Sequence, residues 1–350
     1  MAIRSRTFRE TYHEDIKLFQ TIWIKFWMGL FVFFLAILPF VGDPYIIYLM
    51  NLICVTVIAT IGLNILSGYA GQISLGHAAF FAIGAYTTAI LTDRFGMPFW
   101  ICLPASTVLA GLVGILIGTP CLRLKGLYLA MATMAFGIGM DFVLVTWDAL
   151  TGGVRGLNID HINLFGYPLD SPEKLYYLFL FFTVLSLIVA KNLIRTKVGR
   201  AFVALRDQDV AAEIIGVNLT HYKVLAFFIS SLYAGLAGGL FAYLMGYIHP
   251  EHFTFFLSIE YITIIIVGGL GTVVGTVFGT IFIILIPEII KSLSQTISIL
   301  IPALEGQYNE EWNIAAFGLL IMLFLIFEPT GLYGIWIRIK TCFKNWPFTY

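Results

Sequence analysis

Residues 45–66 have the sequence YIIYLMNLICVTVIATIGLNIL and contain no charged side chain. A helix needs about 20 mostly apolar residues to cross the hydrocarbon core of a bilayer, so this run predicts a transmembrane helix. Apolar runs of the same kind recur and give ten predicted spans in all: residues 26–41, 45–66, 70–91, 99–117, 127–145, 175–190, 224–245, 259–268, 273–289 and 314–327. The sequence therefore predicts an all-α fold, a polytopic transmembrane helix bundle of about ten spans.

The overall composition supports a membrane protein. Of the 350 residues, 59% are hydrophobic and 11% are charged, and the mean hydropathy is +0.92. Soluble domains carry about 25% charged residues, so this chain has too little polar surface to be one. Its net charge of zero gives no electrostatic basis for binding nucleic acid. Its four cysteines show no paired spacing, so neither a disulfide framework nor a metal site is expected.

The basic residues predict an orientation in the membrane. No small-residue cleavage site follows the first apolar run, which predicts a retained span rather than a signal peptide. With both termini cytoplasmic, 16 of the 20 Lys and Arg residues fall on the cytoplasmic side, as the positive-inside rule requires. We therefore expect a cytoplasmic segment 1–25, a transmembrane domain 26–334 with a cytoplasmic loop 191–223, and a cytoplasmic tail 335–350.

Two of the predicted spans are irregular. The third is well apolar only from Ala78, after the stretch GQISLGH at residues 71–77, and the eighth is short and ends in GGLG at residues 268–271. Irregular backbone at membrane depth must face protein or water, and polar side chains there are costly in lipid. Two interpretations stay open, a lining of a translocation pathway and a hydrogen-bonding cluster between helices. The pathway candidates are Gln72, Ser74, Gly76, His77, Gly268, Gly269 and Gly271.

The cytoplasmic loop contains a predicted short helix within residues 199–218. Asp207 or Asp209 can cap its start, and Gly216 suits the left-handed position that ends a helix. Apolar residues at i, i+4 spacing form one face, in the pairs Val210 with Ile214 and Ala211 with Ile215. Because so short a helix is unstable alone, the face needs a cytoplasmic partner or, alternatively, the inner leaflet. The docking candidates are Arg206, Asp207, Val210, Ala211, Glu213, Ile214 and Gly216.

Three further patterns give weaker expectations. Small residues at helical spacing predict close helix packing, in the sets Gly126, Ala130, Thr133 and Gly137, then Gly271, Gly275 and Gly279, then Gly235 and Gly239. Residues 291–304 have the spacing of an amphipathic helix at the outer surface. Asp141 and the TGG stretch 151–153 either meet a substrate arriving from outside or form a plain surface loop.

Several chemistries lack their motifs. The chain has no G-x-x-x-x-G-K-[ST] sequence, so it is not expected to bind ATP in the P-loop manner. It has no His/Cys metal spacing, and no enzymatic activity is expected of it. An ion-coupled secondary transporter usually buries ionisable groups at mid-membrane. Here Asp141, Glu260 and Glu288 are all predicted near the outer edge, which disfavours that class.

Six stretches together resemble the membrane-spanning permeases of bacterial ABC importers for branched-chain amino acids, specifically the larger of the two paired subunits. They are residues 63–91, 122–137 (LRLKGLYLAMATMAFG), 151–156 (TGGVRG), 199–239, 267–275 (VGGLGTVVG) and 328–334 (EPTGLYG). The family also contains urea permeases of near-identical pattern and, more distantly, sugar permeases.

The resemblance implies an inner-membrane importer subunit that moves branched-chain amino acids into the cytoplasm, with a urea or amide permease as the alternative. It implies three kinds of protein partner besides membrane lipid: a homologous second permease, two cytoplasmic ATP-binding subunits and a periplasmic amino-acid-binding protein. ATP would be bound by the partners, and this chain would bind no cofactor. The resemblance also implies that residues 199–218 are the segment seated on an ATPase.

Overall fold

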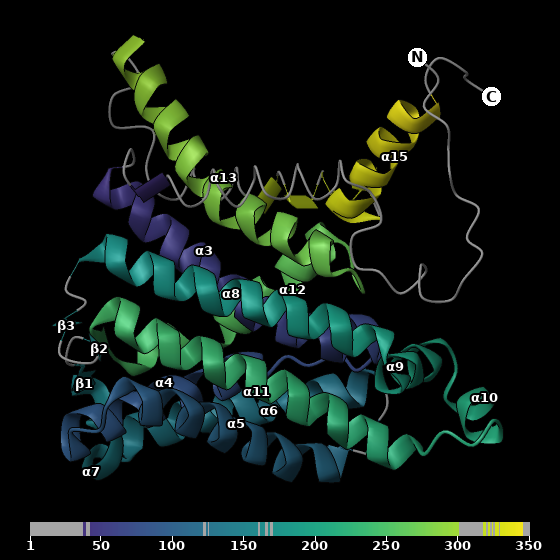
Figure 1. Cartoon of the computed structure of the whole chain (residues 1–350), viewed down its shortest axis with the longest axis horizontal. Coiled ribbons are helices and arrows are strands. Elements are labelled where there is room, and N and C mark those ends of the chain that lie inside the picture. The colour runs from purple at the N-terminus through teal and green to yellow at the C-terminus, as the bar shows by residue number, and fades with distance from the viewer. Residues whose placement is uncertain are drawn as a thin grey trace.

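The computed structural model describes most of the chain, and its helices fill one bundle (Figure 1). The described residues are 38–39, 43–121, 124, 126–159, 162–164, 167–168, 171–300, 318–319, 321–322, 324, 326–328 and 330–345. The long helices are α3 (Pro44–Leu63), α4 (His77–Phe95), α5 (Phe99–Cys121), α6 (Leu127–Thr146), α8 (Pro172–Arg195), α11 (Leu219–Met245), α12 (Phe255–Gly268), α13 (Val273–Leu300) and α15 (Gly331–Asn345). The predicted all-α class is confirmed.

Seven helical segments of the described chain are long and apolar enough to cross a membrane. They are Pro44–Tyr69, Phe99–Cys121, Leu127–Thr146, Pro172–Arg195, Leu219–Met245, Pro250–Gly268 and Val273–Ser292. Helix α4 overlaps the predicted third span, 70–91. It is less apolar than these seven segments, because it begins with His77 and has Asp93 and Arg94 near its end. Only residues 38–39 of the predicted first span, 26–41, and half of the predicted tenth span, 314–327, are described, so the number ten stays a prediction.

The core is formed by α3 and α4, most of whose residues are buried, and by α11, about half of whose residues are buried. Small residues let these helices approach closely. A Cβ atom added at Gly84 would collide with the carbonyl oxygen of Gly235, and one at Gly238 would collide with that of Phe81. Gly235 and Gly239 pack against α5, at Ala110 and Ser106, as the small-residue spacing predicted. Around this core lie α5, α6, α8, α12 and α13, and α6 and α8 expose many apolar side chains.

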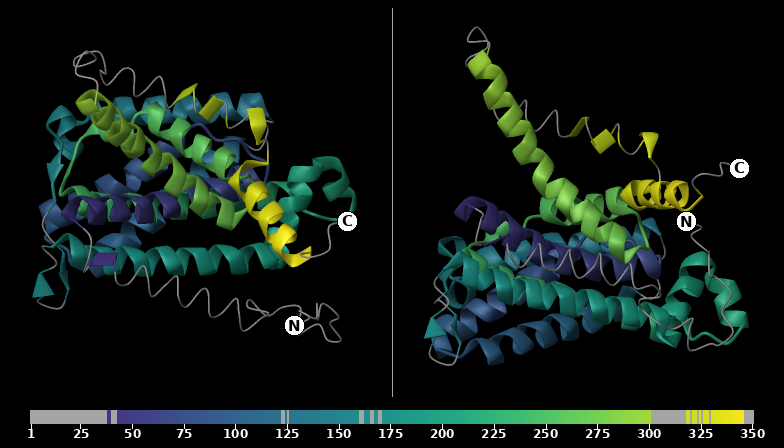
Figure 2. Two further views of the ribbon diagram at one scale, coloured as in Figure 1. Left: turned by 90° about the horizontal axis from the view of Figure 1, so that it is seen from above. Right: turned by 45° about the horizontal axis from the view of Figure 1, so that its top comes forward.

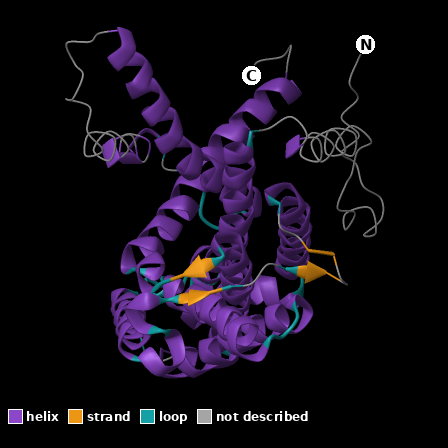
Figure 3. Ribbon diagram, turned by 90° about the vertical axis from the view of Figure 1, so that its left-hand side faces the viewer, coloured by secondary structure: helices purple, strands orange, loops and turns teal. Residues whose placement is uncertain are grey.

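Successive spans run alternately between two ends of the bundle (Figures 1 and 2). At one end, the strand end, β1 (Leu157–Asn158) pairs antiparallel with β4 (Tyr247–Ile248), and β2 (Asn163–Leu164) pairs with β3 (Tyr167–Pro168) (Figure 3). Short helical turns complete this end, namely α7 (Asp148–Thr151), η2 (Gly153–Arg155) and η3 (Pro250–Phe253). The opposite end, the α10 end, carries the π-helix η1 (Asn64–Tyr69), α9 (Lys197–Asp207) and α10 (Asp209–Ile214).

Three sequence-based expectations need correction. The third predicted span is not helical from residue 70, because the backbone leaves the helix and resumes it only at His77. The predicted surface helix 291–304 is, as far as residue 300, a continuation of α13, since no helix-breaking residue follows Pro287; residues 301–304 lie outside the described part. Gly126 does not pack against another helix, because nothing lies within 4 Å of a Cβ added there, and its φ of +57° instead serves the turn that precedes α6.

Candidate translocation and coupling site

The segment between η1 and α4 carries buried polar side chains. Gly71 adopts a φ of +68°, which takes the chain out of the helix. The side chains of Gln72, Ser74 and His77 are at most 6% exposed. Among the described residues, none hydrogen-bonds with Gln72 Nε2, Ser74 Oγ or His77 Nδ1, although His77 Nε2 lies 2.9 Å from the carbonyl oxygen of Ala59. Buried polar atoms without partners are uncommon in proteins, and water is one way to satisfy them. Similar atoms occur elsewhere in the bundle, for example Ser230 Oγ and Ser231 Oγ, so the three atoms here are distinguished by sharing one short segment.

Helices α6 and α12 hold this segment in place. Leu75 N donates to Thr133 Oγ1 at 2.9 Å, and Ala78 N donates to Ser258 Oγ at 3.0 Å. At Gly76, an added Cβ would collide with the carbonyl oxygen of Thr133, so only glycine permits this approach to α6. The polar segment is therefore clamped inside the bundle rather than lying at a lipid-facing surface.

The second irregular segment, Gly268–Gly271, joins α12 to α13. Gly269 and Gly271 have φ values of +117° and +72°, which side-chain-bearing residues rarely adopt. A Cβ at Gly268 would collide with the carbonyl oxygen of Gly275, so the predicted close packing at Gly275 is present. The start of α15 lies against the same turn, since a Cβ at Gly269 would lie 3.1 Å from that of Tyr333.

The segment predicted to contain one docking helix, residues 199–218 (the coupling loop, after the role predicted for it), instead contributes to two helices, α9 and α10. On α10, Val210 is 62% exposed and Ile214 is 81% exposed, and Ile215 just beyond the helix is 74% exposed. Ala211 is exposed as well, whereas Ala212 is buried. The predicted apolar face is thus present and uncovered in this chain. Figure 1 shows α10 standing away from the bundle.

The two ends of α10 differ in how well the sequence predicted them. Gly216 has a φ of +88°, and its N–H donates to Glu213 O at 2.9 Å, which confirms the predicted helix end. The predicted aspartate cap is wrong: Gln208 occupies that position without a side-chain hydrogen bond. Asp209 instead pairs with Lys223 at 3.1 Å, and Asp207 with Arg206 at 3.1 Å. A charged partner competes for the carboxylate because charge-assisted hydrogen bonds are about twice as strong.

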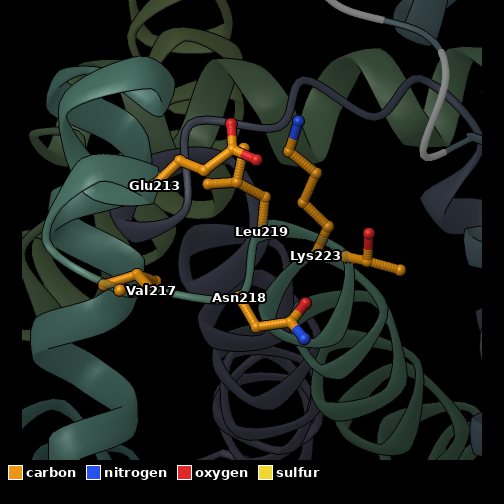
Figure 4. Close-up of a pocket in the computed structure, with 7 residues that line it drawn as sticks. Glu213, Val217, Asn218, Leu219 and Lys223 are labelled. Atoms are coloured by element: carbon orange, nitrogen blue, oxygen red, sulfur yellow. The ribbon is translucent and has the colours of Figure 1, made fainter.

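Two cavities at the α10 end are lined by residues that the sequence analysis singled out. One of about 320 Å³ is lined by Gln72 from the polar segment and by Arg206 and Asp207 from the coupling loop. The other, of about 460 Å³, lies beneath α10, where Glu213 and Lys223 both line it (Figure 4). Gly216 lines this second cavity too. Within the described residues, no group of His, Cys, Asp and Glu is arranged to hold a metal ion.

Some residues that hold the site were not predicted from the sequence. Thr133 and Ser258 clamp the polar segment, and Lys223 anchors α10 to α11. Asn64 is buried in η1 and binds the turn that follows Gly269. Asn64 gave a signal in the sequence as an amide inside an apolar run. Thr133 gave one as a member of a predicted packing face, although not as a hydrogen-bond partner of Leu75. Ser258 and Lys223 are ordinary residue types that local sequence does not single out.

Comparisons of the sequence with known proteins find a matching family. The family of permease components of branched-chain amino acid transport systems matches residues 45–326. This chain belongs to that family. It is 32% identical to LivM of Escherichia coli, a high-affinity branched-chain amino acid transport system permease protein, over 84% of this chain and 71% of LivM.

Two more distant relatives are permease proteins of the same kind of system. LivH of Escherichia coli is 24% identical over 78% of this chain and 89% of LivH, and BraD of Pseudomonas aeruginosa is 23% identical over 78% and 90%. No solved structure matches the chain significantly. Together with the seven apolar helices, the family places this permease in the inner membrane as a multi-pass protein.

Proposed function

We propose that this chain is the larger membrane subunit of an ABC importer that carries branched-chain amino acids into the cytoplasm. The observation that carries the proposal is the match of residues 45–326 to the permease family, together with the 32% identity to LivM. The complete importer would contain a homologous second permease, two cytoplasmic ATP-binding subunits and a periplasmic amino-acid-binding protein. ATP would bind to the two cytoplasmic subunits. This chain would form part of the substrate pathway and would couple it to ATP hydrolysis.

The uncovered apolar face of α10 supports docking to an ATP-binding subunit. Val210 and Ile214 would be buried at that contact, and Arg206, Asp207 and Glu213 would form its polar margin. Closure of the ATPases would then move α10 and α9. The bundle would alternate between states open to each side of the membrane.

The passage for the substrate would run along the polar segment. A hydrophobic amino acid needs a mostly apolar path with a few polar groups that fix its orientation. Gln72, Ser74 and His77 offer buried polar atoms that have no partner among the residues that the structure describes. The glycines of both irregular segments, Gly76 and the 268–271 turn, would let the backbone change shape there.

The full topology is part of the proposal: ten spans, with the 1–25 segment and the 335–350 tail in the cytoplasm. A topology reporter inserted between residues 196 and 208 should report the cytoplasm, and one inserted between 159 and 170 should report the outside. The α10 end would then face the ATPases. If both reporters give the same side, the orientation proposed here is wrong.

Substrate uptake by the assembled importer tests the function. Proteoliposomes that contain the whole complex should accumulate labelled leucine when ATP and the binding protein are present, and should not accumulate urea. Uptake of urea alone would favour the urea permease alternative. Leucine uptake driven by an ion gradient without ATP would overturn the importer proposal in favour of a secondary transporter.

A further inference from the structure

The side chain of Asn64 joins three parts of the α10 end. It lies in the π-helix η1 and is 1% exposed. Its Oδ1 atom accepts a hydrogen bond from Gly271 N at 2.9 Å, and its Nδ2 group donates to Thr272 O at 3.0 Å and to Thr276 Oγ1 at 2.8 Å. One buried amide thus ties the end of the α3 span to the 268–271 turn and to the first turn of α13.

Close packing reinforces this connection. A Cβ added at Gly68, in the same π-helix, would lie 2.5 Å from Gly271 N, so the two backbones touch. Single-turn π-helical segments are rare and frequently mark functional sites. Because the 268–271 turn contains two glycines at positive φ, it can change conformation at low steric cost. We conclude that η1 and this turn cannot move independently of each other.

Arg206 of α9 contacts the same place from the coupling loop. Its Nη1 group donates to the carbonyl oxygen of Gly68 at 3.2 Å. The Cα atom of Arg206 lies 3.0 Å from the position of a Cβ added at Gly71, where the polar segment begins. Helix α9 leads directly into α10 through Gln208. A displacement of α10 would therefore reach η1 and the polar segment through one residue.

We propose that Arg206 and Asn64 are positioning residues that transmit the movement of α10 to the two irregular segments of the pathway. Arg206 couples α9 to Gly68 and Gly71, and Asn64 couples η1 to the 268–271 turn. The inference deepens the proposed function and rests on it, because it assumes that α10 moves when the ATPases close. It assigns the transmission to these two contacts rather than to the packing of α9 and α11 in general.

The test compares Arg206→Gln with Arg200→Gln in the whole importer. Both arginines lie on α9, but the Arg200 side chain donates only to Arg195 O among the hydrogen bonds of the described residues. We expect Arg206→Gln to lower leucine transported per ATP hydrolysed by about tenfold, within the range typical of coupling between sites. This ratio is measured per assembled complex, and assembly with the ATPases is measured separately, because Arg206 also lies at the polar margin of the proposed docking contact. Arg200→Gln should match the parent in both quantities.

Asn64→Ala should give the same loss, and Thr60→Val is its control. Thr60 contacts Thr280 at 3.2 Å, so it joins the same two helices one turn away without contacting Arg206. If one relay contains both residues, the double variant Arg206→Gln with Asn64→Ala should be no worse than the more damaging single variant. Losses that multiply would overturn the relay. If Asn64→Ala fails to assemble, the comparison of Arg206→Gln with Arg200→Gln still tests the relay, since the Arg206 side chain is 41% exposed and lies outside the core.

A conformational readout separates this inference from the proposed function. A cysteine at Leu270, which is 50% exposed in the 268–271 turn, is introduced after the exposed Cys342 has been replaced. ATP should change its reactivity toward a water-soluble thiol reagent in the parent and in Arg200→Gln, but not in Arg206→Gln. An equal ATP response in all three overturns the relay, whatever the substrate is. Absence of leucine uptake by the parent, with this ATP response intact, would instead overturn only the proposed substrate.

Discussion

Ser74 and Ile214 occupy opposite extremes of exposure. Ser74 is a polar residue whose side chain is fully buried, and its hydroxyl has no partner among the described residues. Ile214 is an apolar residue that is 81% exposed on α10. Each side chain is in the environment that the hydrophobic effect and hydrogen bonding disfavour.

The comparison distinguishes two kinds of missing contact. A buried hydroxyl without a partner costs about 1–3 kcal/mol unless water or a ligand satisfies it, so the polar segment suits a path through the bundle. An exposed apolar face outside the membrane gains by burial against another protein. The unpartnered hydroxyl of Ser74 therefore fits a substrate pathway, and the exposed apolar face of α10 fits a contact with another subunit. The variants below test each of these two assignments.

The largest effect is expected for Ala211→Glu on the exposed face of α10. An unpaired charge buried at a protein contact costs several kcal/mol, which is enough to weaken docking more than about tenfold. Because Ala211 is exposed in this chain, folding and membrane insertion should be normal. Transport and substrate-stimulated ATPase activity should be lost, and both are measured on the purified complex.

Gln208→Glu is the matched control for this variant. Gln208 is exposed and lies just before α10, outside the apolar face. Adding the same charge there should change transport little. Equal transport by Ala211→Glu and the parent would mean that α10 does not dock on a protein and rests on anionic lipid instead.

A second, intermediate effect is expected for Gly71→Ala. Gly71 and Gly96 both have positive φ, and alanine at such a position costs about 1 kcal/mol or more. At Gly71 the added methyl would also lie 3.0 Å from Arg206 Cα, whereas nothing lies within 4 Å at Gly96. Uptake assays should show about tenfold lower transport for Gly71→Ala than for Gly96→Ala. Equal transport would show that α9 need not approach the polar segment closely.

A third prediction concerns water in the pathway. Ser74 and Ser106 are both fully buried, but Ser106 Oγ donates to Leu103 O at 2.8 Å. A cysteine at Ser74 should react with a small water-soluble thiol reagent at a rate that changes when ATP is added. A cysteine at Ser106 should be silent. If the Ser74 cysteine is silent in every state, the polar segment is a structural cluster between helices.

The smallest effect is expected for Asp209→Asn. Asp209 pairs with Lys223 at 3.1 Å, and both side chains are largely buried, so the pair fixes α10 on α11. Losing one charge should cost the loop about 1 kcal/mol, more than is typical of an exposed pair. Proteolysis between residues 208 and 218 should become about fivefold faster, because opening of the loop becomes that much more frequent. Asp207→Asn, which removes the more exposed pair with Arg206, should change the rate less.

Local patterns in the sequence were sufficient for parts of this account. The spacing of Val210 and Ile214 predicted the face of α10, and Gly216 predicted where that helix ends. The Gly/Ser-rich stretch 71–77 predicted an irregular third span, although the helix begins later than residue 70. Each of these features depends on residues within about two turns of one another, which periodicity and turn chemistry describe.

Contacts between distant residues could not be predicted in this way. Gly271 is 207 positions from Asn64, and Ser258 is 180 positions from Ala78. Nothing in the local sequence of Asp209 indicates that Lys223 competes for its carboxylate. The same limit applies to the glycine contacts, because the spacing of Gly126 resembled a packing face although no helix lies against it. The structure at these positions depends on contacts between residues that are distant in the sequence.

The most direct test of the central claim places a photo-crosslinking residue at Ile214 in the assembled importer. The control position is Leu112, which is 54% exposed on α5, a helix assigned to the membrane. The probe at Ile214 should crosslink to an ATP-binding subunit, and the probe at Leu112 should crosslink to no ATP-binding subunit. If the probe at Ile214 labels only lipid, α10 does not dock on an ATPase.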